Sequence, residues 1–230
     1  EAAIVDYLDK IIDPFLNPQK RVYVGYLIAA VLVAVGLPYL LSGKSTRKTL
    51  STLFARRIWW SKSARADYGI VAINQACMMG VMPRLVSKLA LATIIFETMH
   101  IWFDGRPNLW PNAPGWVIAG VFTTTLFVLD DAAKYVIHRA LHRIPLLWCF
   151  HRVHHTAETL TPFTVYRTHP VEGIIFALRA IFVQALAIGV FFFFFGDRTE
   201  LLTLLGANAF IFFFNVINIF FIKWLYNFNE

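Results

Sequence analysis

The sequence predicts an all-α fold, a polytopic membrane helical bundle of about four to five spans. Hydrophobic residues make up 58% of the 230 residues and charged residues only 15%, whereas soluble domains are about 45–50% apolar and about 25% charged. Long apolar stretches, including the phenylalanine run from Phe191 to Phe195, alternate with short polar segments. A backbone in lipid must satisfy its hydrogen bonds internally, so stretches of this length are expected to be helices rather than strands.

The apolar stretches divide a single membrane domain, residues 1–230, into predicted spans. A spanning helix needs about 20 mostly apolar residues, and the spans are predicted near residues 22–41, 85–103, 116–137, 174–195 and 201–222. Residues 69–82 precede Pro83-Arg84 and are expected to form a partial or interfacial segment. Residues 104–114 contain three prolines and are expected to form a loop. The asparagines of the last span are expected to hydrogen-bond between helices; they are Asn208, Asn215 and Asn218.

The net charge of +7 is explained by basic residues in the loops beside the spans, where they set topology and meet anionic lipid head groups. No basic face interleaved with aromatic residues is present, so nucleic-acid binding is excluded. The basic 43–68 loop is expected in the cytoplasm, and one net crossing later the histidine-rich segment 130–173 is expected on the same face. This arrangement predicts a multi-pass protein of a bacterial inner membrane or the endoplasmic reticulum. Cys77 and Cys149 are expected to be buried thiols outside any disulfide framework.

Five of the seven histidines fall within eighteen residues: His138, His142, His151, His154 and His155. Side chains four apart on a helix share a face, and Pro145 is expected to end the first helix so that the second group folds back toward the first. An all-imidazole site suits iron, zinc, copper or nickel better than magnesium or calcium. The alternative is a set of interfacial histidines without a metal, but unpaired polar groups at the end of a membrane span are costly.

The pattern Asp131-x3-Tyr135-x2-His138-Arg139-x2-His142, followed by His151-Arg152-Val153-His154-His155, resembles the fatty acid hydroxylase and sterol desaturase superfamily over about residues 127–175. Thr168-His169-Pro170-Val171-Glu172 is similar to a further stretch of that family. The resemblance implies an O2-dependent membrane oxidoreductase that hydroxylates or desaturates a C–H bond of a lipid or sterol. It also implies two non-haem iron ions, with zinc as a substitute, and an external electron donor such as cytochrome b5, a ferredoxin or a reductase.

The resemblance also suggests roles for single residues. The five clustered histidines are the expected metal ligands, and His169 is either a sixth ligand or a hydrogen-bonded histidine before a proline turn. Asp131 and Tyr135 are candidates to orient imidazole rings, although Asp131 could instead pair with Lys134 or an arginine.

Three further acidic residues are given structural roles. Asp130 is expected to be a solvated or interfacial charge. Glu172 is expected to pair with Arg167 in preference to supporting a ligand. Glu97 and His100 form an ExxH pattern that is read as a polar pair or a lining of the substrate path.

One departure from the family pattern leaves two hypotheses open. The family has a third histidine cluster after its last membrane hairpin, whereas no histidine follows Glu172 here. Five or six ligands are too few to hold two irons, so the chain is expected to be incomplete at its C-terminal end. The alternative is a non-catalytic membrane subunit of a larger complex that keeps the scaffold. A metal transporter fits less well, because the histidines cluster on one face of the membrane.

Overall fold

The computed structural model describes residues 2–20, 22–43, 45–81, 85, 87–104, 109–204 and 207–226. Its first half contains α1 (Ala2–Leu16), α2 (Val24–Ser42), α3 (Thr46–Leu53), α4 (Arg56–Trp59), α5 (Lys62–Val81) and α6 (Lys88–Phe103). Its second half contains α7 (Gly115–Arg143), α8 (Pro145–His151), the 3-10 turns η2 (His154–Thr156) and η3 (Pro162–Tyr166), α9 (Pro170–Phe195), η4 (Gly196–Arg198) and α10 (Ala209–Tyr226). A two-residue antiparallel pair, β1 (Thr203–Leu204) with β2 (Ala207–Asn208), precedes α10. The predicted all-α class is confirmed.

Within the described residues, three helical segments are long and apolar enough to cross a membrane: α2, α7 and the segment Pro170–Arg198 that contains α9. They correspond to three of the predicted spans. The predicted span at 85–103 is the 16-residue helix α6, and the total number of crossings stays a prediction.

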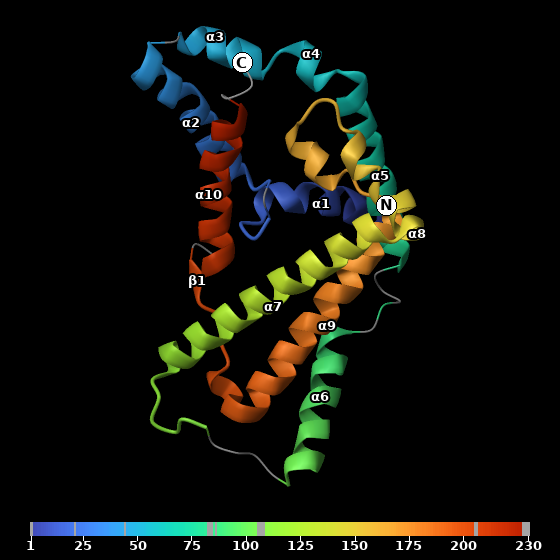
Figure 1. Ribbon diagram of the computed structural model, residues 1–230, viewed down its shortest axis with the longest axis vertical. Helices are drawn as coiled ribbons and strands as arrows, with labels where there is room; N and C mark the ends of the chain where they lie inside the picture. Colours follow the sequence, from blue (N-terminus) through green and yellow to red (C-terminus); the bar gives the residue numbers. More distant parts are fainter. Residues whose placement is uncertain are drawn as a thin grey trace.

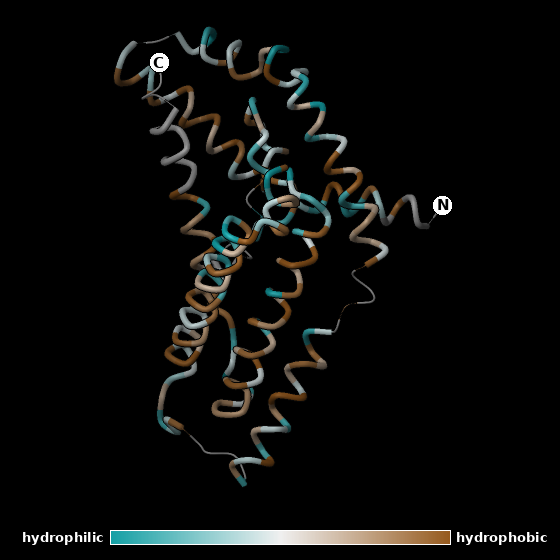
Figure 2. The backbone as a smooth tube through the Cα atoms, turned by 45° about the vertical axis from the view of Figure 1, so that its right-hand side comes forward, coloured by the Kyte–Doolittle hydropathy of each residue, from teal (hydrophilic) through white to brown (hydrophobic). Residues whose placement is uncertain are grey.

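The helices α7 and α9 run antiparallel and form the centre of the lower half of the molecule, with α6 on the other side of α9 (Figure 1). Hydrophobic residues cover most of these three helices (Figure 2). A Cβ atom added to Gly189 of α9 would lie 2.8 Å from the Ala92 carbonyl oxygen of α6. Small residues allow helix backbones to approach this closely in membranes, so α6 and α9 pack as one unit.

An ion pair joins α7 to α9 in the middle of this bundle. Nη1 of Arg179 lies 2.7 Å from Oδ1 of Asp130 and also donates to the Asp130 carbonyl oxygen at 2.9 Å. Lys134 lies 2.6 Å from Oδ2 of the same carboxylate. Asp130 is therefore not simply a solvated charge, because the part-buried carboxylate bridges one cation from α9 and another from its own helix; the alternative of an interfacial charge stays a prediction.

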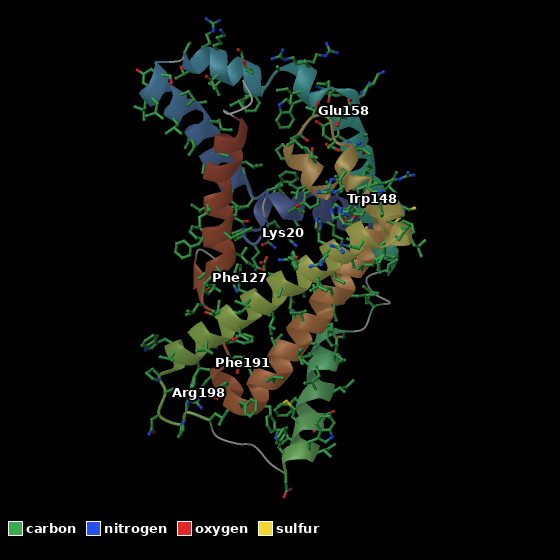
Figure 3. All side chains as sticks on the ribbon, in the orientation of Figure 1. Lys20, Phe127, Trp148, Glu158, Phe191 and Arg198 are labelled. Carbon is green, nitrogen blue, oxygen red and sulfur yellow. The ribbon has the colours of Figure 1, made fainter. Side chains whose placement is uncertain are left out.

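The loops at the two ends of the α7–α9 pair differ in character. At one end Arg198 donates to the Trp110 carbonyl oxygen at 3.2 Å, which brings the predicted loops 104–114 and 196–200 together. At the other end α7 stops before Pro145, which begins α8 as the sequence predicts. Figure 3 shows Arg198 and Trp148 at these opposite ends. The histidines therefore lie at the far end of the bundle from both loops.

The upper half of the molecule pairs α2 with α10, while α1, α5 and η3 pack together beside the end of α7 (Figure 1). The helix α5 begins at Lys62, earlier than the segment expected at 69–82, because Ser61 accepts from the Ala64 amide and starts the helix. Tyr7 of α1 donates to the Ala72 carbonyl oxygen of α5 at 3.0 Å. The helix α5 thus packs against η3, in the segment that follows α8.

Three smaller expectations need correction or restriction. The last helix begins at residue 209 instead of 201, because Thr203–Leu204 and Ala207–Asn208 form the β1–β2 pair and Asn208 caps α10 by accepting from the Phe210 amide at 3.0 Å. Oδ1 of Asn208 caps its own helix, Asn215 is buried, and the side chain of Asn218 lies outside the described residues, so interhelical hydrogen bonding by these asparagines stays a prediction. Cys77 and Cys149 are exposed, so the expectation of buried thiols is wrong; apolar neighbours in sequence do not reveal which face of a helix turns outward.

Candidate metal centre

Three imidazole rings from two helices meet at the end of α7. Nε2 of His142 lies 3.1 Å from Nε2 of His138 and 3.2 Å from Nε2 of His151. The nearest ring nitrogens of these three residues all lie within 4.8 Å of one another. The chain reverses at Pro145, and this brings α8 back against the last turn of α7. Within the described residues, this is the one group of three or more potential ligands close enough to share an ion.

The 3-10 turn η2 adds two more rings. Nε2 of His155 lies 3.2 Å from Nε2 of His151, and the ring of His154 stacks over that of His151 at a centroid distance of 5.7 Å. The Trp148 ring borders the group, 5.3 Å from His142 and 5.5 Å from His155. These five histidines and Glu172 are called the histidine cluster below.

Glu172, in the first turn of α9, fixes the orientation of His151. Both side chains are buried, with 1% of His151 and 3% of Glu172 exposed, and Oε1 of Glu172 lies 3.0 Å from Nδ1 of His151. A carboxylate oxygen accepts, so Nδ1 carries the proton and Nε2 of the neutral ring presents a lone pair to the other histidines. This arrangement of carboxylate and imidazole is the one that orients metal-binding histidines in proteins.

The distances within the cluster fit a bound cation. With metal–imidazole bonds of about 2.0–2.1 Å, two ligands of one ion lie about 2.9–3.4 Å apart, and the three Nε2 separations are 3.1, 3.2 and 3.2 Å. Nδ1 of His154 and Oε2 of Glu172 are buried without a hydrogen-bond partner among the described residues. Buried polar atoms are rarely left unsatisfied. The donor set and these two atoms together fit a metal ion better than a metal-free polar core.

The protonation state of the cluster also favours metal binding. Burial lowers the pKa of His151, and the nearby His142 and His154 lower it further. Burial and the same neighbouring rings lower the pKa of His155. Both rings are therefore neutral at pH 7, which is the form that binds a metal.

His169 lies outside the group of three ligands. Its Nδ1 accepts from the Val171 amide at 3.2 Å and so caps α9, while its ring packs on Phe150 at 4.8 Å. A capping role corresponds to the hydrogen-bonded alternative, and ligation by His169 stays a prediction.

The residues expected to orient the rings from α7 point elsewhere. Asp131 is exposed and makes no hydrogen bond to a histidine among the described residues. Tyr135 is 62% exposed, and its hydroxyl accepts from Arg139 at 3.3 Å. The alternative pairing with Lys134 belongs to Asp130 and not to Asp131. The orienting carboxylate visible at the site is that of Glu172.

Arg167 does not pair with Glu172 as expected. Its guanidinium lies 2.8 Å from Oδ1 of Asp67, a residue of α5 with no exposed surface. The sequence contains no short-range signal for this pair, because the two residues are 100 positions apart. Glu172 instead faces His151 and supports a candidate ligand, which is the less expected of its two predicted roles.

The ExxH pair on α6 lies outside the cluster. Nδ1 of His100 is hydrogen-bonded to the Phe96 carbonyl oxygen at 3.1 Å, and its ring packs on Phe193 at 4.9 Å. Glu97 is exposed. His100 is a packed helix residue, and it provides a natural control for experiments on the clustered histidines.

Residues 123–229 match the family model described as fatty acid hydroxylase. The match contains the whole histidine cluster and confirms the family resemblance predicted from the histidine pattern. No curated protein and no solved structure matches the chain. Residues 1–122, including α5, lie outside the matched segment.

Proposed function

We propose that the protein is an O2-dependent membrane oxidoreductase that hydroxylates or desaturates a C–H bond of a lipid or sterol at a non-haem iron centre. The observation that carries the proposal is the convergence of the Nε2 atoms of His138, His142 and His151 next to a carboxylate-oriented ring, within a segment of the fatty acid hydroxylase family. Three helical segments suited to a membrane agree with a substrate that dissolves in lipid.

The residues of the proposed metal centre have different roles. His138, His142, His151 and His155 would hold the metal through Nε2, and Glu172 would keep His151 in the ligating tautomer. Bound iron supplies the activation of O2 that oxidation of an unactivated C–H bond requires. The Trp148 ring packs beside the rings of His142 and His155, with centroid distances of 5.3 and 5.5 Å, and would help to orient them.

The number of ions is part of the proposal. The four Nε2 atoms of His138, His142, His151 and His155 are sufficient to bind one ion. The second iron that the family resemblance implies would need further donor atoms. Nδ1 of His154 and Oε2 of Glu172 are buried without a hydrogen-bond partner among the described residues, and they are the candidates for these further donors. The electrons would come from a separate partner such as cytochrome b5, a ferredoxin or a reductase, and we propose that the centre faces the cytoplasm.

The test compares lipids and metal content in cells that express the wild-type chain, His142→Ala or His100→Ala. Lipid extracts analysed by mass spectrometry are expected to contain a product 16 mass units heavier or 2 lighter than its precursor, which correspond to one added oxygen atom or two lost hydrogen atoms in the two proposed reactions. We expect this product with the wild-type chain and with His100→Ala, but not with His142→Ala. Purified wild-type protein should contain iron, and His142→Ala should lose it. Absence of both product and bound iron from the wild-type protein would support the non-catalytic subunit instead.

A further inference from the structure

We propose that Arg167 is a positioning residue of the metal centre, which fixes the turn carrying His154 and His155 against α5. The inference rests on the proposed function, because it assigns Arg167 a task in holding the ligands of that centre. The Arg167 side chain lies in a hydrogen-bonded set of polar residues, called the Arg167–Asp67 network: Ser63, Asp67, Thr156, Thr164 and Arg167. All of them are buried except Thr156, which is exposed.

On one side, the Arg167 guanidinium is hydrogen-bonded to the turn that carries His154 and His155. Nε donates to the Val153 carbonyl oxygen at 3.2 Å and to Oγ1 of Thr156 at 3.2 Å. Nη2 donates to Oγ1 and to the carbonyl oxygen of Thr156, at 2.9 and 3.3 Å. Val153 and Thr156 immediately flank His154 and His155. The backbone of the turn is therefore bound at both ends by one side chain.

The same guanidinium is anchored to α5 on its other side. Nη1 donates to Oδ1 of Asp67 at 2.8 Å and to the carbonyl oxygen and hydroxyl of Ser63, both at 3.3 Å. Oδ2 of Asp67 accepts from Thr164 at 2.6 Å, so both carboxylate oxygens are used. Ser63 also accepts from the amides of Glu158 and Thr159, at 3.2 and 3.4 Å. The anchor is thus a fully hydrogen-bonded part of α5.

A fork-shaped cation is needed to span these two sides. Arginine presents five N–H donors in a fixed plane, whereas lysine presents its three donors from a single nitrogen atom. A lysine could neutralise Asp67, but it could not hold the turn and α5 at once. Substitution by lysine therefore separates the positioning role from simple charge neutralisation.

The network also explains why residues outside the family match matter to the centre. Asp67 and Ser63 come from α5, upstream of the matched residues 123–229. Because they hold Arg167, and Arg167 holds the turn, the upstream helix contributes to the placement of His154 and His155 without supplying a ligand.

The experiment uses the full chain in lipid nanodiscs and three variants. Arg167→Lys keeps the charge and loses the fork. The double variant Asp67→Leu/Arg167→Met removes both charges together, since an apolar replacement of a whole buried pair is tolerated far better than loss of one partner. Arg65→Lys, on the exposed face of α5, is the matched control. Affinity for Co(II), the Co(II) absorption spectrum and hydrogen exchange of residues 152–157 in the metal-free protein are measured for each.

For Arg167→Lys and for the double variant we expect about a 10–100-fold loss of Co(II) affinity, the range for loss of a group that orients ligands. We also expect an altered Co(II) spectrum and faster exchange of residues 152–157, while Arg65→Lys behaves as wild type. Wild-type affinity and exchange in Arg167→Lys would overturn the proposal. If the wild-type protein binds no Co(II), the proposed function fails, and the exchange rates alone decide whether Arg167 orders the turn.

Discussion

Two groups of polar residues meet at the turn that carries His154 and His155, and they differ in how completely their atoms are satisfied by hydrogen bonds. In the Arg167–Asp67 network every charged atom has a hydrogen-bond partner. In the histidine cluster, Nδ1 of His154 and Oε2 of Glu172 have none within the described part of the chain, and four Nε2 atoms lie 3.1–3.2 Å from their nearest neighbours in the group. The satisfied network needs no further partner, whereas the unsatisfied atoms of the cluster are what the proposed metal ion would bind.

The largest effect is expected where the satisfied network loses one charge. Asp67→Ala would leave Arg167 buried without its carboxylate, and loss of one partner of a buried ion pair costs about 3–5 kcal/mol. The free energy of unfolding, measured by denaturant titration in detergent, should fall by that amount. Asp131→Ala, which removes an exposed carboxylate, is the control and should change it by less than about 0.5 kcal/mol. Equal stability of the two variants would contradict the distinction between network and surface.

In the histidine cluster the loss of a charge should appear in metal binding and not in folding. Glu172→Gln keeps the size of the side chain and an oxygen that can accept from Nδ1 of His151, but it removes the negative charge. We expect metal affinity to fall about 10–100-fold while the stability of the metal-free protein changes little. Glu97→Gln on the exposed face of α6 should leave affinity unchanged. If the metal-free Glu172→Gln protein were strongly destabilised, the histidine cluster would contribute to the stability of the fold as well as to metal binding.

A single hydroxyl of the network offers a finer test. Thr164→Val keeps the shape and removes the hydroxyl, which donates to Oδ2 of Asp67 at 2.6 Å and accepts from the Thr161 amide at 2.9 Å. Hydrogen bonds to charged groups contribute about 1.5–3 kcal/mol, and we expect the lower end because Arg167 still neutralises the carboxylate. The control Thr49→Val removes only an exposed bond within its own helix. A change below about 0.5 kcal/mol for Thr164→Val would mean that the network tolerates an unsatisfied atom.

The smallest effect concerns pH and the metal-free cluster. The pKa values of His151 and His155 are lowered in the folded protein, so both states are neutral above the unfolded value of about 6.5. As the pH falls from there toward the folded pKa, the unfolded chain binds protons that the folded protein does not, and stability declines. Between pH 7 and pH 6 the loss is at most about 0.7 kcal/mol per ring. Unfolding midpoints across this range, with and without Zn(II), test the sign; stability that rises on acidification would contradict it.

The parts of the fold that depend on local pattern were predictable from the sequence. Apolar length located α2, α7 and α9, and Pro145 marked the reversal that joins the two histidine groups. Spacing of His138 and His142 on one helix face predicted that their rings would meet. These features each depend on residues close in the chain.

The parts that depend on tertiary contacts were not predictable. Glu172 and Arg167 were expected to pair because they are close in sequence, yet each has a partner from another element, His151 and Asp67 respectively. The capping roles of Asn208 and His169 depend on where α10 and α9 begin, and apolarity alone sets such boundaries poorly. Asp131 has the residue type of an orienting carboxylate, but the rotation of α7 leaves it exposed.

The close contact between Gly189 and Ala92 has a consequence for biogenesis. The helix α6 leaves the ribosome about 100 residues before the part of α9 that packs on it. At synthesis rates of about 5–20 residues per second, α6 waits about 5–20 seconds for its partner. During that interval its packing face is available to lipid, to the insertion machinery or to a chaperone, so insertion of this bundle is completed only when α9 has been translated.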